Sequence, residues 1–340
     1  MRILRRLLTL AVLLAIGAAA ALWWARQELA RPSAQAGTVL VKVQAGESLR
    51  AVLGDLERKG ALRMPRLAEL YARYQDRGKA HAQVGSYEIA AHSTPLQILE
   101  QLRDGRIVMH QFTIIEGWSF AQLRSALAAD AFIDHVWRSY TDTQLMAALG
   151  AAGLHPEGQF FPDSYRFAPG TADSRVYQLA YERMRSELAS AWQGRAPNLP
   201  IKSAQELLTL ASIVEKETGR EDERTRVAAV FANRLRIGMK LQTDPTVIYG
   251  LGDSYDGDLR SRDLLGDNPY NTYTRYGLPP TPIALPGAAS LRAAAQPAAS
   301  PALYFVATGD GDGSHHYSAT LAEHNIAVKR FLARTRGKRP

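Results

Sequence analysis

The segment SAQELLTLASIVEKET, residues 203–218, carries apolar side chains at helical spacing and two glutamates near its end. At about 100° per residue, Leu210 and Val214 lie on one face of the predicted helix. Glu217 follows Leu210 by seven residues and lies about 20° from it in projection, so Glu217 extends the apolar face. Glu215 points about 140° away from Leu210, onto the polar side. We therefore expect the two carboxyl groups of EKET to have different surroundings.

A carboxyl group on the apolar face of a helix can serve as an acid. Loss of water favours the neutral form and would raise the pKa of Glu217. A glutamate that stays protonated near neutral pH can donate a proton to a leaving oxygen as a general acid. The alternative is that the helix end frays, so that Glu217 is solvated or pairs with Arg220. Position on the helix alone slightly favours this alternative.

A second candidate region is the polar, Gly- and Pro-rich stretch at residues 242–287. We expect a long loop here, and loops of this length are usually functional when they are ordered. Its short polar side chains alternate with tyrosines, a combination that suits carbohydrate, although turns and helix caps explain the same residues equally well. The candidate substrate-binding residues in it are Gln242, Thr243, Asp244, Thr246, Asn271, Thr272 and Tyr273.

Near the N-terminus, residues 7–25 form an uncharged, apolar run of nineteen. As a helix, that length nearly spans a hydrocarbon core of about 30 Å. Arginines precede the run and Trp23 and Trp24 close it, which predicts a single membrane helix with its N-terminus in the cytoplasm. A cleaved signal peptide is the alternative, with the alanines at 18–21 as the cleavage region.

The net charge of +8 is concentrated at the two ends of the chain. Four arginines flank the apolar run, and six basic residues lie at positions 329–339. The rest of the chain holds 31 basic and 33 acidic side chains, so we expect no nucleic-acid-binding surface. The basic tail is expected to be solvated, with anionic lipid or wall polymer as the alternative.

Composition and motifs also exclude several kinds of site. The chain contains no cysteine, which excludes disulfides, thiolate metal sites and a cysteine nucleophile. The HExxH motif is absent, and the adjacent His315 and His316 would point to opposite faces of a strand. Turn chemistry explains the aspartates at 253–258 better than a calcium loop does. We expect no metal ion and no cofactor.

The periodicity predicts an α+β fold in several parts. Residues 1–26 form a cytoplasmic tip and the membrane helix, and residues 27–38 form a linker. Residues 39–107 read as strand, helix, helix, strand and helix, with Ser48 as one of the helix caps. Residues 108–340 are expected to form a larger mixed α+β catalytic domain.

Several longer motifs carry a resemblance to a known family. The chain is similar to the endolytic murein transglycosylases of the YceG-like (MltG) family along nearly its whole length, most densely at residues 205–328. The motifs that carry the resemblance are ASIVEKET (211–218), NRLRIGMKLQTDPTVIYG (233–250), YNTY (270–273), GLPPTPIALPG (277–287), LYFVA (303–307) and TLAEHN (320–325).

The resemblance implies a single-pass protein of the inner, cytoplasmic membrane with its body in the periplasm. It also implies that residues 39–107 form a small LysM-like α/β module that binds peptidoglycan. The family's essential glutamate falls on Glu217, in agreement with the helix-face prediction. His315 and Tyr317 match the family's glycine–histidine–aromatic pattern and are implied substrate-binding residues, whereas His316 departs from that pattern.

The resemblance further implies a reaction. The family cleaves the β-1,4 bond between N-acetylmuramic acid and N-acetylglucosamine within nascent glycan strands and leaves 1,6-anhydro ends, which would terminate strand elongation. Peptidoglycan is then the expected partner, and penicillin-binding-protein synthases are candidate protein partners. Two alternatives stay open. One is a wall-binding membrane scaffold without catalysis, and the other is a muramidase that hydrolyses the bond with Asp244 as a second carboxylate.

Overall fold

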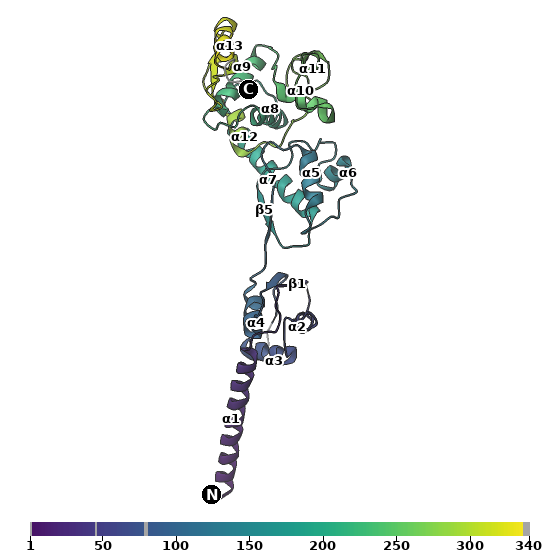
Figure 1. The fold of residues 1–340 in the computed structure, drawn as a ribbon, viewed down its shortest axis with the longest axis vertical. Coiled ribbons are helices and arrows are strands. Elements are labelled where there is room, and N and C mark those ends of the chain that lie inside the picture. Colours follow the sequence, from purple (N-terminus) through teal and green to yellow (C-terminus); the bar gives the residue numbers. More distant parts are fainter. Residues whose placement is uncertain (1, 45, 78–80, 336–340) are drawn as a thin grey trace. The chain divides into compact units, whose positions relative to one another are not determined.

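The computed structural model describes residues 2–44, 46–77 and 81–335 of the chain. It is a mixed α+β structure with an N-terminal apolar helix, as predicted (Figure 1). Two compact units make up the chain: unit 1 has residues 1–111 and 166–170, and unit 2 has residues 112–165 and 171–340. Of the basic tail, Arg336, Lys338 and Arg339 lie outside the described residues.

Unit 1 combines the long apolar helix with a small module of helices and one strand pair. Its elements are α1 (Arg2–Leu29), β1 (Val39–Val43), α2 (Leu49–Arg58), α3 (Pro65–Gln75), β2 (Gly85–Ile89) and α4 (Pro95–Asp104). β1 and β2 are antiparallel, with Val39 opposite Ile89. The hydroxyl of Ser48 caps α2 by accepting the N–H of Ala51, and the order of elements after α1 is the one predicted.

Within the described residues, one helical stretch is long and apolar enough to cross a membrane, namely Arg6–Leu29 of α1. Trp23 and Trp24 near its end are exposed, at 66% and 50%. Leu29 is only 1% exposed and packs into the core of the module with Leu53. A helix of this kind near the N-terminus is consistent with a membrane anchor and with a signal sequence.

Unit 2 is mainly helical. Its elements are α5 (Phe120–Ala129), β4 (Ile133–Asp134), α6 (Asp142–Ala148), β6 (Thr171–Ala172), α7 (Asp173–Gln193), α8 (Ala204–Glu217), α9 (Arg224–Arg236), α10 (Asp244–Leu251), the 3-10 turn η1 (Gly252–Ser254), α11 (Ser261–Leu265), α12 (Ala288–Ala295), β7 (Tyr304–Ala307), β8 (His315–Ser318) and α13 (Leu321–Thr335). β4 pairs in parallel with β6, and β7 pairs antiparallel with β8. A further pair, β3 (His110–Thr113) with β5 (Ser164–Phe167), contributes residues to both units.

The centre of unit 2 is α8, in which every residue from Leu207 to Val214 is buried. This helix contacts α7, α9, α10 and α12, so it must be apolar around most of its circumference. The two polar residues of the run, Thr209 and Ser212, donate their hydroxyl hydrogens to the helix backbone. Ser212 Oγ also accepts a hydrogen bond from the N–H of Ile283. This bond holds the proline-rich segment, residues 277–287, against α8. The single apolar face that the periodicity predicts is therefore only part of the buried surface.

The region at 242–287, expected to be a long loop, contains α10, η1 and α11. Pro245 lies in the first turn of α10, where its missing N–H leaves no helical hydrogen bond unmade. Val247 is fully buried and Tyr249 packs against the core of unit 2. Tertiary contacts therefore stabilise a helix of eight residues that would be too short to persist alone, which is why local patterns missed it.

A buried carboxylate joins two of these helices. Glu157 is 3% exposed and accepts the N–H of Phe120, at the start of α5, at 3.0 Å. It also accepts the hydroxyl of Tyr249 on α10 at 3.1 Å. Burial raises the pKa of Glu157 to about 7, because the hydrogen bonds from Phe120 and Tyr249 only partly offset the lost hydration.

Glu157 should make the stability of the protein depend on pH. Between pH ~4.5 and ~7 the unfolded state releases this proton before the folded state does, so stability falls as pH rises and levels off above about pH 7. The free energy of unfolding should decrease by about 3 kcal/mol over this range, because each unit of difference in pKa between the two states contributes about 1.4 kcal/mol. Denaturant titrations of wild type and Glu157→Gln at about pH 4 and about pH 8 measure it.

The stability of Glu157→Gln should no longer fall between pH ~4.5 and ~7. Glu221→Gln, at an exposed position in unit 2, should show the same fall as wild type. Equal pH slopes for Glu157→Gln and wild type would show that this carboxyl does not titrate as its surroundings predict.

Candidate functional site

Glu217 is the last residue of α8, and its side chain is half-buried where the helix leaves the apolar core. The helix does not fray before it, since the N–H of Thr218 still donates to the carbonyl of Val214 at 3.4 Å. Arg220 is engaged elsewhere, because its guanidinium pairs with Asp222 at 2.8 Å. The end of α8 is thus ordered, and Glu217 stands apart from the arginine that could have neutralised it.

Glu217 lies in the wall of a cavity of about 410 Å³ in unit 2. Of the predicted substrate-binding residues, Gln242, Asp244 and Tyr273 also line this cavity. The remaining lining residues are Arg234, Tyr304, Phe305, Leu321 and His324. The cavity therefore collects residues from α8, α9, α10, β7 and α13 and from the connecting segments, which come together in unit 2 (Figure 1). Aromatic walls with a few polar groups are typical of ligand sites.

The surroundings of Glu217 favour its protonated form. Burial raises the pKa of Glu217, and the nearby negative charge of Asp244 raises it further. Thr243 lowers the pKa of Glu217 by donating its hydroxyl hydrogen to Glu217 Oε1. The charges of His315 and Arg234 also lower it. Because the loss of hydration is the largest of these effects, the pKa of Glu217 lies above the ordinary value of a glutamate.

The other carboxyl of the EKET motif has different surroundings, as predicted. Glu215 Oε2 accepts the N–H of Gly287 at 3.0 Å, on the side of α8 where the proline-rich segment packs. Residues two apart on a helix differ by about 200° in direction, so Glu215 and Glu217 contact different parts of the protein. Glu215 fastens a segment to the helix, whereas Glu217 reaches the cavity.

Two threonines, Thr246 and Thr272, position Thr243, the residue that contacts Glu217. The N–H of Thr243 donates to the hydroxyl of Thr272 at 3.1 Å. The hydroxyl of Thr246 donates to the carbonyl of Thr243 at 2.8 Å and lies 2.9 Å from the hydroxyl of Thr272. Thr246 and Thr272 are 0% and 2% exposed, so the structure places them behind the cavity wall. Thr243 precedes α10 without capping it, because its hydroxyl is directed to Glu217.

Asn271 and Tyr273 have separate tasks in the same loop. Asn271 is fully buried, and its amide donates to backbone carbonyls of the α11 region, including that of Gly266 at 2.6 Å, while its Oδ1 accepts the N–H of Tyr273. The hydroxyl of Tyr273 donates to Asp244 at 2.6 Å inside the cavity. Asn271 therefore shapes the loop, and Tyr273 orients a carboxylate.

The backbone at Gln242 has an uncommon conformation. Its φ of 48° lies in the left-handed region, which non-glycine residues rarely adopt. The N–H of Gln242 donates to the carbonyl of Thr272 at 3.1 Å, so the threonine framework also holds this residue. Strained backbone of this kind is concentrated at functional sites.

His315 and Tyr317 meet on a buried glutamate rather than in the cavity wall. Glu223 is 4% exposed, and its carboxylate accepts hydrogen bonds from Nδ1–H of His315 at 2.6 Å and from the hydroxyl of Tyr317 at 3.3 Å. The ring of His315 packs edge-on against Phe305, which does line the cavity. The residue pattern around Glu223 is typical of a solvated charge in the first turn of a helix, whereas the structure buries it against His315 and Tyr317 of β8.

Sequence reasoning also missed Arg234 and His324. Arg234 is 7% exposed, and its guanidinium donates to the carbonyls of Leu303 and Leu241 while lying in the cavity wall. A signal was available, since Arg234 follows Val227 by seven residues and so lies on the buried stripe of α9. His324 stacks on Tyr304, and its Nδ1 is buried without a hydrogen-bond partner among the described residues.

No group of three or more His, Asp or Glu side chains could hold a metal ion within the ranges that the structure describes. The cavity itself offers carboxyl groups, hydroxyl groups and aromatic rings. A protonatable glutamate shares the wall of a polar and aromatic cavity with a second carboxylate, Asp244, and with the buried guanidinium of Arg234.

Comparison with known proteins places this chain among a group of related sequences. The profile described as the YceG-like family matches residues 41–330. An endolytic murein transglycosylase of Bacillus subtilis (strain 168) is 30% identical over 314 residues, which cover 87% of this chain and 85% of the relative. An endolytic murein transglycosylase of Streptococcus pneumoniae (strain D39) is 25% identical over 323 residues, covering 85% of this chain and 58% of the relative.

A solved structure agrees with these matches. The crystal structure of a yceG-like protein from Listeria monocytogenes has a TM-score of 0.54 and 28% sequence identity to this chain. The similarity covers 86% of this chain and 99% of that one.

Removing the hydroxyl of Thr243 should raise the pKa of Glu217. Thr243→Val keeps the branched shape of the side chain but removes the hydrogen bond that lowers the pKa of Glu217. Desolvation and the charge of Asp244, which raise this pKa, are then less offset, so the carboxyl stays protonated to higher pH. A ¹³C NMR titration of glutamate side chains, assigned by comparison with Glu217→Gln, measures the change. Thr274→Val, whose hydroxyl donates to Asp267, should leave the titration as in wild type. An unchanged or lowered pKa in Thr243→Val would contradict the role given to this bond.

Proposed function

This chain belongs to the YceG-like family, and we propose that it is an endolytic lytic transglycosylase of peptidoglycan. The observation that carries the proposal is Glu217, whose pKa is raised by burial at the wall of a cavity of about 410 Å³. Its substrate would be a glycan strand of the cell wall. The bond cleaved would be the β-1,4 link between N-acetylmuramic acid and N-acetylglucosamine.

Glu217 would act first as the acid and then as the base. The protonated carboxyl donates its hydrogen to the glycosidic oxygen, and the bond from that oxygen to the anomeric carbon of the muramyl sugar breaks. The 6-hydroxyl of the same sugar attacks the anomeric carbon, and the Glu217 carboxylate accepts the proton that this hydroxyl loses. The glutamate is protonated again, a 1,6-anhydro end is formed and no water is consumed.

The neighbours of Glu217 would divide the remaining work. Asp244, oriented by Tyr273, would stabilise the positive charge that develops at the anomeric carbon. Thr243 would stabilise the carboxylate form between the two steps by its hydrogen bond. Arg234, whose guanidinium lies in the cavity wall, would bind polar substituents of the sugar, and the ring of His324 would contact it. Glu223 would hold the ring of His315, whose charge acts on Glu217.

The rest of the chain would bring this site to the wall. We propose that α1 is a retained single-pass anchor in the inner membrane, with the body in the periplasm. Residues 39–107 would form a LysM-like module that binds peptidoglycan, supported by the strand–helix–helix–strand order of β1, α2, α3 and β2. Residues 108–340 would form the catalytic domain, whose cuts would terminate strand elongation near penicillin-binding-protein synthases.

Glu217→Gln should slow cleavage by about two to four orders of magnitude, since an amide cannot supply the proton. The matched variant Glu215→Gln should keep most of the activity, because its amide oxygen can still accept the N–H of Gly287. The measurement is the rate at which anhydro-ended fragments appear, by mass spectrometry, when the full-length protein acts on purified glycan strands. A Glu217→Gln protein as fast as wild type would overturn the assignment, and absence of cleavage by wild type would favour a wall-binding scaffold.

The position of Asp244 in the same cavity favours hydrolysis as the second candidate reaction. We expect Asp244→Asn to go on making anhydro ends, because the muramyl hydroxyl replaces water and no second base is needed. Removing the like charge should also lower the pKa of Glu217, so the loss of activity at alkaline pH should begin at a lower pH. Products of wild type that are heavier by one water, and that vanish in Asp244→Asn, would establish hydrolysis instead.

A further inference from the structure

One side of α3 in unit 1 exposes apolar and basic residues together. Leu70 and Tyr74 are 66% and 67% exposed, which is high for large side chains of this kind. Arg66 and Arg73 lie within about 60° of Leu70 in helical projection, and Arg77 follows the helix end. We call Arg66, Leu70, Arg73, Tyr74 and Arg77 the α3 outer face. Glu69, beside it, is engaged by Arg73 at 2.8 Å.

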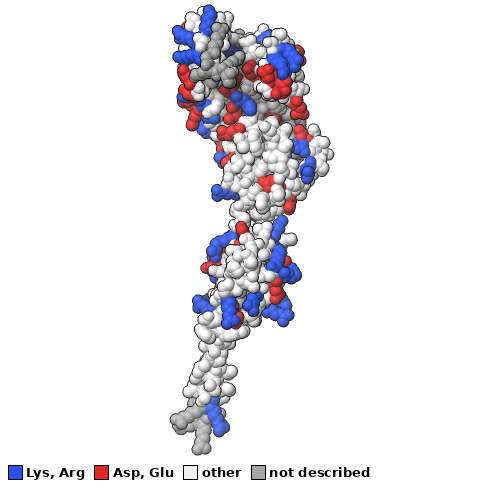
Figure 2. All heavy atoms as spheres, viewed as in Figure 1, with Lys and Arg blue, Asp and Glu red and all other residues white. Residues whose placement is uncertain are grey.

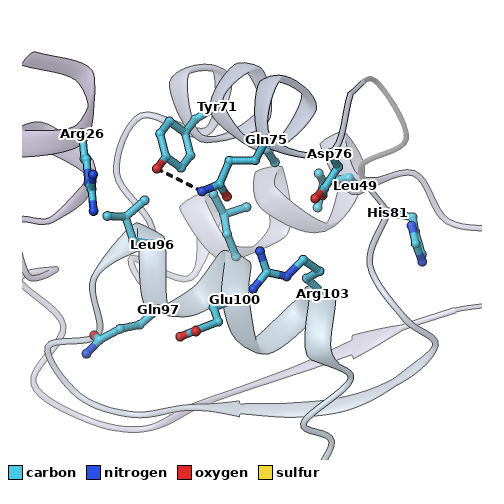
Figure 3. Close-up of a pocket in the computed structure, with 12 residues that line it drawn as sticks. Arg26, Leu49, Tyr71, Gln75, Asp76, His81, Leu96, Gln97, Glu100 and Arg103 are labelled. Atoms are coloured by element: carbon cyan, nitrogen blue, oxygen red, sulfur yellow. Dashed lines mark hydrogen bonds between the residues drawn. The ribbon is translucent and has the colours of Figure 1, made fainter. Parts of the chain in front are cut away.

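The other sides of α3 are already occupied. Ala68 and Ala72, about 160° from Leu70, are buried in the core of the module. Tyr71 and Gln75 line a cavity of about 230 Å³ between α3 and α4, and the amide of Gln75 donates to the hydroxyl of Tyr71 at 3.2 Å (Figure 3). The outer face is therefore the part of α3 that packing within the module leaves uncovered.

α3 lies against the end of the apolar helix. The two helices are in contact, and Arg26 of α1 lines the same cavity as Tyr71 (Figure 3). A second, smaller hollow is lined by Leu29 of α1 together with Arg63 and Met64, which directly precede α3. Because Leu29 is buried in the module core, the module cannot drift away from α1 without breaking that core.

This attachment sets the height of α3 above a membrane that α1 spans. Trp23 and Trp24 suit the interface, where tryptophans gather. Leu29 follows Trp24 by five residues, which is about 8 Å of helix, so the module begins at the level of the lipid headgroups. Figure 2 shows basic side chains on the module close to the uncharged surface of α1.

We propose that the α3 outer face rests on the membrane surface, with its arginines among anionic phospholipid headgroups and Leu70 and Tyr74 at the interface. Of this face, Arg66 and Arg77 form no ion pair with another described residue, so both are available for phosphate groups. Exposed leucine and tyrosine flanked by arginines are the composition of helices that lie in a membrane interface. A sugar polymer without lipid would leave the apolar part of this face unexplained.

The consequence is a fixed orientation for the module. Resting on two points, the end of α1 and the α3 outer face, unit 1 would stand on the membrane instead of swinging about a flexible stalk. The proposal depends on α1 staying in the membrane and goes beyond the chemistry at Glu217, so it can fail while that chemistry stands.

The absence of cysteine from the chain allows a direct test. Full-length Leu70→Cys, labelled with an environment-sensitive fluorophore, is reconstituted into vesicles that contain phosphatidylglycerol. Leu40→Cys is the matched control, because Leu40 is also an exposed leucine, at 49%, but lies on β1, at the end of the module away from α1 (Figure 1). Quenching by a nitroxide on the lipid headgroup is compared with quenching by iodide in solution.

We expect the label at position 70 to be quenched several-fold more by the lipid nitroxide, and several-fold less by iodide, than the label at position 40. Adding Arg66→Glu, or replacing phosphatidylglycerol with phosphatidylcholine, should weaken the lipid quenching at position 70. If positions 70 and 40 are quenched alike by both agents, the α3 outer face is in solvent or covered by something other than lipid, and the proposal is wrong.

Discussion

Glu217 occupies the point at which α8 leaves the apolar core, and its carboxyl accepts a hydrogen bond from Thr243. Two requirements meet there. The carboxyl must lose enough water to hold its proton, and it must keep one donor that stabilises the anion once the proton has gone. Enclosure of α8 meets the first requirement, and the loop that precedes α10 meets the second. The rest of unit 2 can be understood as the structure needed to hold these two segments together.

Buried polar residues around the site hold the loop that carries Thr243. Thr246 and Thr272 are buried and bind the backbone and hydroxyl groups near Thr243, while Asn271 shapes the same loop through backbone carbonyls. Each of these groups is satisfied, so the loop has one arrangement of low energy and carries no buried unmet donor at these positions. Replacing such a residue would alter Glu217 indirectly, by moving Thr243, and a loss of activity there would not identify a group that touches substrate.

Charge is distributed unevenly between the two units in a way that suits their expected surroundings. Unit 2 places acids and hydroxyls inside a cavity, where a sugar could be protonated and bound. Unit 1 places arginines and exposed apolar side chains next to the end of α1. The excess positive charge of the chain, which by itself resembles a nucleic-acid signal, thus belongs to the N-terminal segment, the module beside it and the C-terminal end.

Local patterns in the sequence were enough for the features that depend on neighbours along the chain. The apolar run of α1, the strand–helix order of the module, the cap at Ser48 and the position of Glu217 on the apolar side of α8 all follow from helical or strand periodicity. Only the tertiary structure decided which distant segments meet. Glu223 binds His315 across 92 residues, and Arg234 joins His324 in one cavity. Local spacing cannot supply this information, because the hydration of a charged side chain depends on what covers it, and the covering segments are chosen by the packing of the whole core.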